Sequence, residues 1–193
     1  MRTKKGAAKE IIINAAWELF QEKGYEETTL KDIIERSGTS RGAFYHNFRS
    51  KEDVLFMMAW YFDKEYDGWL EKQDPEENRL DLLMKYLMYS SESVENSEYK
   101  SFLPALYGYE VMTEGRRYIL DENRPYFQIL YALLQEALQR GELKEDKAAY
   151  DQARVIGEIH RGLTYSWLLS ECRYSLTDIV QIVLKTYIDS IRA

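Results

Sequence analysis

Apolar residues recur at three- and four-residue spacing along most of this chain, which is the period of an α-helix with one buried face. A first helix is predicted from Lys4 or Lys9 to Lys23, with Gly24 as its end. Its apolar positions are Ile12, Ala15, Ala16, Leu19 and Phe20. No segment shows the strict alternation of apolar and polar residues that is typical of a strand. The pattern therefore predicts an all-α protein.

Two short helices joined by a tight turn are predicted within residues 28–55. Thr29 and Asp32 have the three-residue spacing of a capping box, so the first of these helices begins there. Gly38 follows its last residues and permits the positive φ that ends many helices. Thr39 or Ser40 can then cap the second short helix.

The second short helix has one apolar side and several polar ones. Phe44 and Phe48 lie four residues apart and point to the core. The other faces carry Arg41, Gly42, Tyr45, His46 and Asn47. A short helix, a glycine turn and a second helix with an outward donor-rich face form the arrangement that places a helix in the major groove of DNA.

The remaining pattern predicts longer helices, about nine in the whole chain. Ser50 and Asp53 repeat the capping spacing and open a continuous aromatic helix from Lys51 to about Lys72, long enough to connect one domain to the next. Further helices are predicted over residues 76–95, 99–112 (short or kinked at Pro104), 116–140 (bent or broken near Pro125), 147–172 and 176–191.

Residues 10–55 resemble the DNA-binding domain of the TetR (tetracycline-repressor-like) family of bacterial transcriptional regulators. The resemblance rests on the ordered segments Leu19–Phe20, EKGYEETTL, DIIERSG, SRGAFYHNF and SKEDVL. Thr39 stands where Val is more frequent, and Asn47 where His or Tyr is usual. The resemblance implies an N-terminal three-helix helix-turn-helix domain over residues 1–50 and a C-terminal helical ligand-binding and dimerisation domain over residues 51–193.

The resemblance also implies the DNA contacts, residue by residue. Thr29, Tyr45 and Lys51 would bind phosphates, which position a protein on DNA without reading its sequence. Ser40, Arg41, Gly42 and His46 would lie toward the base edges, and Arg41 suits guanine O6 and N7. Thr39 is a further candidate for DNA contact. For His46 and Thr39 an ordinary surface role is about as favoured.

The net charge of −7 argues against DNA binding only when it is taken over the whole chain. Residues 1–53 hold ten basic and nine acidic side chains, so the acidity lies in the remainder. Phosphates respond to the field within a Debye length, about 8–10 Å. A basic tip of Lys4, Lys5, Arg41, Arg49 and Lys51 is therefore compatible with a DNA operator as the partner.

Dimerisation is expected through the last two helices. Both have wide apolar stripes, and Ala149, Ala153 and Gly157 would permit close helix packing. The alternative is that these stripes cover only their own core. The family resemblance favours a homodimer, which also has a physical reason, because two helices related by a two-fold axis read a palindrome.

The second domain has more aromatic and Met side chains than a small core needs, which suggests a pocket for an apolar or aromatic effector. For each residue alone, a core position is favoured over ligand contact. The candidates are Phe62, Tyr66, Trp69, Met84, Met88, Phe102, Tyr109, Tyr126, Phe127 and His160. Acidic residues near these positions would suit a lipophilic cation, although solvated faces are the favoured reading for Asp63, Glu65, Asp67, Glu110 and Glu158.

Catalysis is not expected. His160 and Glu158 are two apart and face different sides of a helix, and pairing His160 with Cys172 matches no catalytic signature. The single cysteine forms no disulfide framework or cysteine zinc site, and neither a metal nor a cofactor is expected.

No apolar run suits a membrane span or signal peptide, so a cytoplasmic location is expected. A regulator or architectural protein controlled by a protein partner remains the alternative.

Overall fold

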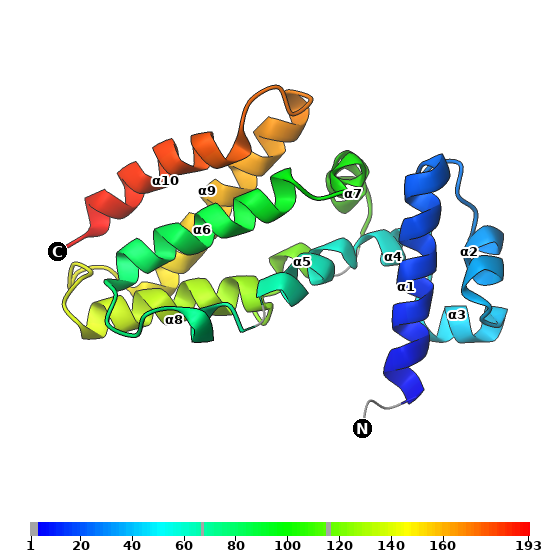
Figure 1. Ribbon diagram of the computed structural model, residues 1–193, viewed down its shortest axis with the longest axis horizontal. Helices are drawn as coiled ribbons and strands as arrows, with labels where there is room; N and C mark the ends of the chain where they lie inside the picture. Colours follow the sequence, from blue (N-terminus) through cyan, green and yellow to red (C-terminus); the bar gives the residue numbers. More distant parts are fainter. Residues whose placement is uncertain (1–3, 67, 115–116) are drawn as a thin grey trace. The chain divides into compact units, whose positions relative to one another are not determined.

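The computed structural model describes residues 4–66, 68–114 and 117–193, which form ten α-helices and three 3-10 turns (Figure 1). Over these ranges the only extended pairing is a single β-bridge between Leu143 and Arg192. The prediction of an all-α protein is confirmed. None of the described helices is long and apolar enough to cross a membrane.

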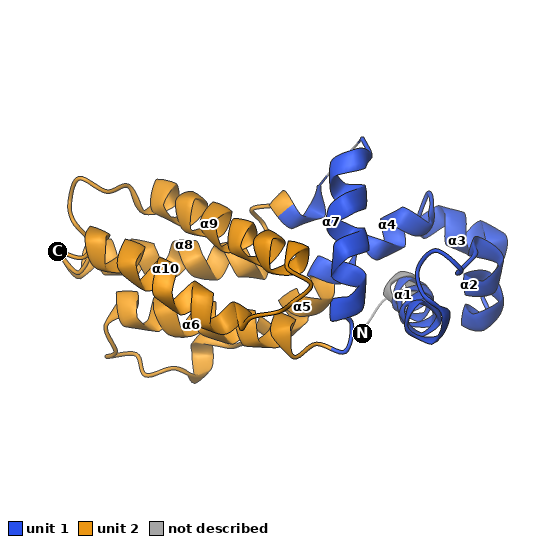
Figure 2. Ribbon diagram, turned by 90° about the horizontal axis from the view of Figure 1, so that it is seen from above, with its two compact units in different colours: residues 1–59, 98–119 blue, residues 60–97, 120–193 orange. Residues whose placement is uncertain are grey.

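The chain folds into two compact units (Figure 2). The first unit contains residues 1–59 and 98–119, and the second contains residues 60–97 and 120–193. The chain passes from the first unit to the second within helix α5, Met58–Tyr66. The functional division expected after residue 50 stays a prediction.

The first unit is built on α1, Lys4–Lys23, which packs against α2, α3 and α4. Its other helices are α2 (Leu30–Ser37), α3 (Arg41–Asn47), α4 (Lys51–Leu55) and α7 (Leu103–Met112), with a 3-10 turn over Lys100–Phe102. The fully buried side chains Ile12, Phe20, Ile33, Phe44 and Leu55 form its core. The predicted apolar face of α1 is therefore the face on which the short helices pack.

The second unit is a bundle of four longer helices. These are α6 (Arg79–Glu95), α8 (Pro125–Gln139), α9 (Ala149–Leu169) and α10 (Leu176–Ile191). Helix α6 packs on α8 and α10, and α9 packs on the same two helices (Figure 1). Leucine side chains such as Leu83, Leu87, Leu134 and Leu184 are completely buried between them.

The prediction of one continuous helix from Lys51 to Lys72 is wrong. Helix α4 ends at Leu55, where the Met57 N–H donates to the Val54 carbonyl only three residues back, at 3.2 Å. Helix α5 ends at Tyr66, and Gly68 has a φ of +67°, which does not continue a right-handed helix. A 3-10 turn over Leu70–Lys72 follows. This segment therefore forms two short α-helices and a 3-10 turn instead of one continuous helix.

Other helix boundaries follow local chemistry. The Asn78 side chain accepts hydrogen bonds from the N–H groups of Leu80 and Asp81, so α6 begins at Arg79 and three residues later than predicted. The break predicted near Pro125 is confirmed, because a 3-10 turn covers Tyr118–Leu120 and Pro125 opens α8 as its first residue.

Candidate DNA-binding surface and ligand groove

The start of α2 has the predicted capping box. The Thr29 hydroxyl accepts from the Asp32 N–H at 3.2 Å, and the Asp32 carboxylate accepts from the Thr29 N–H at 2.8 Å. Lys23 donates to the same carboxylate at 2.6 Å and, with Thr29, holds the pKa of Asp32 well below its usual value. Gly38 ends α2 with a φ of +62°. These contacts fix the exposed Thr29 at the N-terminus of α2.

Helix α3 separates its apolar and polar residues as predicted. Ser40 caps it by accepting from the Ala43 N–H at 3.1 Å, while Phe44 and Phe48 are buried. The polar face is exposed, with the Arg41 guanidinium 5.8 Å from the centre of the Tyr45 ring. The exposed members of this face are Ser40, Arg41, Gly42, Tyr45 and His46.

Two residues of this region are turned toward the protein itself. The Thr39 hydroxyl forms a hydrogen bond with the Ser37 hydroxyl at 2.8 Å and is only half-exposed. The Asn47 amide donates to the Ala43 carbonyl at 2.8 Å, within its own helix. Both side chains therefore support the turn and the helix in this structure.

Lys51 is held against the loop before α2. Its ammonium group donates to the Tyr25 carbonyl at 2.7 Å and lies 4.0 Å from the centre of the Tyr25 ring. The Tyr25 hydroxyl donates to Glu52 at 3.2 Å, and the Tyr25 ring lies 5.2 Å from that of Tyr109 on α7. The sequence pattern did not single out Tyr25, which is buried although it stands in a loop.

The predicted ligand residues divide between the two units. Phe102 and Tyr109 belong to the first unit, where Phe102 lies 5.8 Å from Phe20, ring centre to ring centre. The other eight belong to the second unit. The structure therefore does not gather all ten residues within one unit.

Five side chains in the second unit form an aromatic cluster: Tyr66, Trp69, Tyr86, Tyr126 and His160. The Tyr86 ring centre lies 5.1 Å from that of Trp69, 5.6 Å from Tyr66 and 6.0 Å from Tyr126. The Tyr126 ring stacks on His160 at 5.7 Å. Four of these residues were predicted, and Tyr86 was not.

His160 is buried and hydrogen-bonded on both sides of its ring. Nδ1 shares a hydrogen bond with the Tyr126 hydroxyl at 2.6 Å, and Nε2 with the Ser91 hydroxyl at 2.9 Å. Burial, with a smaller contribution from the Arg161 charge, lowers the pKa of His160 to about 4. The imidazole is therefore neutral at neutral pH and acts as a polar bridge between α6, α8 and α9.

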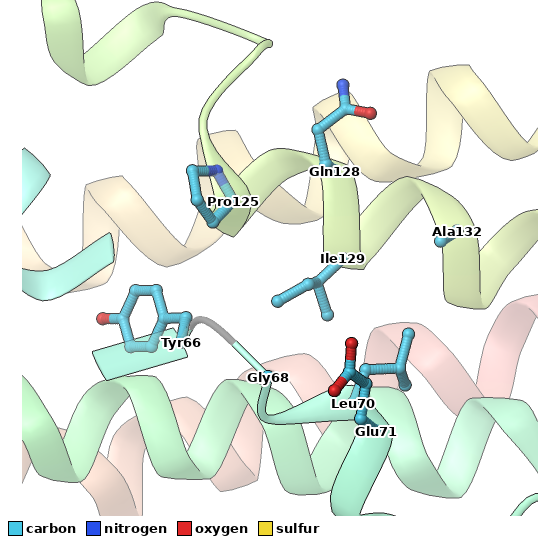
Figure 3. Close-up of a pocket in the computed structure, with 8 residues that line it drawn as sticks. All are labelled: Tyr66, Gly68, Leu70, Glu71, Pro125, Gln128, Ile129 and Ala132. Carbon is cyan, nitrogen blue, oxygen red and sulfur yellow. The ribbon is translucent and has the colours of Figure 1, made fainter. Parts of the chain in front are cut away.

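A groove of about 440 Å³ lies between the segment after α5 and the first half of α8 (Figure 3). Its lining residues are Tyr66, Gly68, Leu70, Glu71, Pro125, Gln128, Ile129 and Ala132. Of the predicted ligand residues only Tyr66 lines it. Met84 and Met88 line a second groove of about 410 Å³ between α6 and α10, while Phe62 is buried and Phe127 packs on Tyr150.

The acidic side chains considered for a cationic ligand mostly have protein partners. Asp63 and Arg124 form a buried ion pair with two hydrogen bonds, of 2.8 and 3.0 Å. Glu110 pairs with Arg117 at 3.3 Å and Glu158 with Arg161 at 2.8 Å. The exposed Glu65 accepts a hydrogen bond from Ser93. Asp67 lies outside the described residues. This pairing weakens the argument for a lipophilic cation.

A three-helix unit with a buried core, whose third helix is capped and exposes a polar face, is the arrangement of a helix-turn-helix DNA-binding protein. Residues 12–58 match the family "Bacterial regulatory proteins, tetR family", and this match covers the whole surface built from α2, α3 and α4. Residues 12–58 therefore form a DNA-binding domain of the TetR family of transcriptional regulators.

The similarity to known proteins extends over nearly the whole length of the chain. The chain is 25% identical over 190 residues to the fatty acid metabolism regulator protein of Bacillus subtilis (strain 168), covering 93% of each chain. It is 27% identical over 206 residues to the HTH-type transcriptional repressor BepR of Brucella suis biovar 1 (strain 1330), covering 100% of this chain and 96% of the relative. The structure of Thermus thermophilus FadR, a TetR-family repressor in complex with lauroyl-CoA, superposes with a TM-score of 0.72. At 21% identity, with 92% and 91% of the two chains covered, this similarity shows the shared fold.

Proposed function

We propose that this protein is a cytoplasmic repressor that binds a palindromic DNA operator as a homodimer and leaves it when a small apolar or aromatic ligand binds. The observation that carries the proposal is the exposed polar face of α3, which Phe44 and Phe48 anchor to the core from the opposite side. Because nothing in the described fold covers Arg41, Tyr45 or His46, this face is available to base edges and phosphates.

The residues have distinct roles in this proposal. Arg41 binds a guanine edge, with Ser40, Gly42 and His46 beside it, and Thr39 supports the turn. Tyr45 and Thr29 bind phosphates through their hydroxyl groups. Lys51 either reaches a phosphate from the Tyr25 ring or keeps the loop fixed beside the N-terminus of α4. The DNA-binding domain ends near residue 50, and the rest of the chain carries dimerisation and ligand binding.

Two variants test the DNA contacts and a third serves as the control, with affinity measured by fluorescence anisotropy on a labelled operator. The operator is obtained by selecting bound fragments of genomic DNA with the wild-type protein. Arg41→Ala is expected to weaken specific binding by about 1–3 kcal/mol per half-site and relax the preference at one position. Lys51→Ala is expected to weaken binding to all sequences alike and reduce the salt dependence.

The control is Lys185→Ala, which removes an exposed lysine from α10 and is expected to leave DNA binding unchanged. Thermal unfolding of Lys51→Ala separates loss of the phosphate contact from loss of the Tyr25 contact. If Arg41→Ala binds the selected operator as tightly as the wild type does, the assignment of α3 to the major groove is wrong.

Dimerisation through α9 and α10 is supported by apolar side chains that the chain itself leaves exposed. Val155, Tyr165 and Leu169 on α9, and Ile182 on α10, are between 39% and 67% exposed. Gly162 of α9 is also exposed, and a Cβ added there would meet no atom within 4 Å. A glycine inside a helix costs stability, so its presence on this surface fits close approach of a second copy.

Control by a ligand is supported by the groove of about 440 Å³ beside the aromatic cluster, a volume in the range of small-molecule sites. The FadR relative binds lauroyl-CoA, a molecule with a long apolar chain. A regulator answering only to a protein partner needs no such groove. The ligand-responsive function is therefore favoured, and loss of operator binding upon addition of an apolar compound tests it.

A further inference from the structure

The hydroxyl group of Tyr86 has no hydrogen-bond partner among the described residues, although the side chain is completely buried. Buried polar groups in folded proteins nearly always have a partner, because an unpaired one carries its full desolvation cost. Its neighbour Tyr126 shows the usual arrangement, with its hydroxyl 2.6 Å from His160 Nδ1. Tyr86 therefore requires an explanation that Tyr126 does not.

Tyr86 is connected to the groove through the aromatic rings that it contacts. It is on α6, and its ring contacts Tyr66, which is itself one of the residues that line the groove. Its ring also contacts Trp69, which precedes the lining residues Leu70 and Glu71. In Figure 3 the Tyr66 ring forms one end of the groove, and the Ile129 side chain points into the space from α8. Tyr66 therefore contacts both the groove and the Tyr86 ring, and access from the groove to Tyr86 requires movement of the Tyr66 side chain.

The surroundings of Tyr86 decide which chemical group it can bind. Burial raises the pKa of Tyr86 far above its usual value, so the hydroxyl stays protonated and can donate. Arg124 is the cation whose charge acts on Tyr86, and its guanidinium already donates two hydrogen bonds to Asp63. A ligand carboxylate would compete with Asp63 for this guanidinium and would lose its hydration. An uncharged oxygen acceptor has neither difficulty.

We propose that Tyr86 is a hydrogen-bond donor of the effector site, and that the effector is an uncharged, mostly apolar molecule with a carbonyl, ether or hydroxyl oxygen at one end. The groove between Leu70 and Ile129 takes the apolar body, and Tyr86 binds the oxygen. The inference rests on the proposed ligand-controlled function and adds the class of ligand and the residue that selects it.

Stability without any added compound gives the first test. Tyr86→Phe removes an unpaired hydroxyl and keeps the ring, so the melting temperature is expected to stay the same or rise. Tyr126→Phe is the matched control, because it removes a hydroxyl that is paired with His160, and its melting temperature is expected to fall. If Tyr86→Phe lowers the melting temperature as much as Tyr126→Phe does, the hydroxyl is satisfied within the folded core and the proposal is wrong.

Binding of four compounds that share a naphthalene ring gives the second test, by equilibrium dialysis against wild type and Tyr86→Phe. The compounds are 2-acetylnaphthalene, 2-ethylnaphthalene, 2-naphthoate and 2-naphthylmethylammonium. Wild type is expected to bind the acetyl compound most tightly. Tyr86→Phe is expected to bind it about fivefold to tenfold more weakly, the loss of one hydrogen bond, while its affinity for the ethyl compound is unchanged.

The outcomes separate this inference from the proposed function. Equal loss for the acetyl and ethyl compounds would assign Tyr86 a packing role and overturn the inference, as would strongest binding of the carboxylate or the ammonium compound. Failure of all four compounds to bind wild type would also overturn the inference, because the groove would then not accept an apolar ligand with an oxygen acceptor. Operator binding by wild type, measured in parallel, is independent of these results and decides the DNA-binding function by itself.

Discussion

Replacing Gly42 with alanine is expected to change fold stability and DNA binding in opposite directions. Gly42 is the second residue of α3 and is exposed, and a Cβ added there would meet only the Ser40 hydroxyl, at 3.9 Å. No contact within the protein requires glycine at this position. Alanine is the better helix former by roughly 0.5–1 kcal/mol in a helix interior, and the lower end applies in the first turn.

The expected gain in stability is therefore about 0.5 kcal/mol, which raises the melting temperature of a protein of this size by about 1–2 °C. In the proposed complex, the added methyl group would lie where α3 meets the floor of the major groove. Overpacking a well-packed core typically costs about 1–3 kcal/mol, and the same cost at a close interface would weaken operator binding about fivefold to 150-fold for each half-site. Calorimetry gives the first quantity and anisotropy titration with the selected operator gives the second.

The matched control is Gly108→Ala in α7, an exposed helical glycine whose added Cβ would meet no atom within 4 Å. This variant is expected to gain stability like Gly42→Ala and to bind the operator like wild type. If Gly42→Ala also binds the operator like wild type, Gly42 does not face the DNA and the proposed docking of α3 must be revised. If Gly42→Ala loses stability, the local conformation of α3 is not the one described.

The remaining predictions concern pH and assembly. The pKa of His160 is about 4 in the folded protein against about 6.5 in an unfolded chain, so the unfolded state takes up the proton first as pH falls. The contribution of neutral His160 is therefore complete above pH 6.5 and is lost toward pH 4, with an upper value of about 3 kcal/mol. Urea unfolding between pH 7 and pH 5 is expected to show this decline, and His160→Gln to flatten it; an equal slope in both proteins would refute it. Leu169→Glu is expected to convert the proposed dimer to monomers in sedimentation experiments, whereas Leu120→Glu, at another exposed leucine, is not. A dimeric Leu169→Glu would exclude this part of α9 from the interface.

The helix-turn-helix was predictable because its signals are local. A capping box needs only the spacing of Thr29 and Asp32, and a helix end with positive φ needs only a glycine at position 38. The burial of Phe44 and Phe48 follows from their four-residue spacing once α3 is known to be a helix. Each of these features depends on residues close in sequence, and the structure has each of them.

The segment from Lys51 to Lys72 shows why such reasoning fails over longer distances. Its buried residues Val54, Met58, Phe62 and Tyr66 keep a helical spacing throughout, so the apolar pattern contains no sign of a break at Phe56 and Met57. The periodicity of apolar residues shows which side of the chain faces the core. It does not show where the backbone changes from hydrogen bonds between residues four apart to hydrogen bonds between residues three apart. Gly68 was the visible signal for the second break, and its positive φ is the reason that the helix ends before it.

The candidate ligand site was only partly predictable, because composition gives the number of aromatic residues but not the position of each one in the fold. Phe102 and Tyr109 have the same apolar character as Tyr66 and Tyr126, yet tertiary packing places the first pair beside Phe20 and Tyr25 in the other unit. Tyr86 stands between Leu83 and Leu87 on the buried side of α6, where the pattern predicts an ordinary core residue. What distinguishes it is a hydroxyl without a partner, and a partner can be sought only when residues distant in sequence are placed in space. Local patterns therefore suffice for the proposed surface that reads DNA through one short helix, whereas the proposed ligand site, assembled from α5, α6 and α8, depends on tertiary contacts.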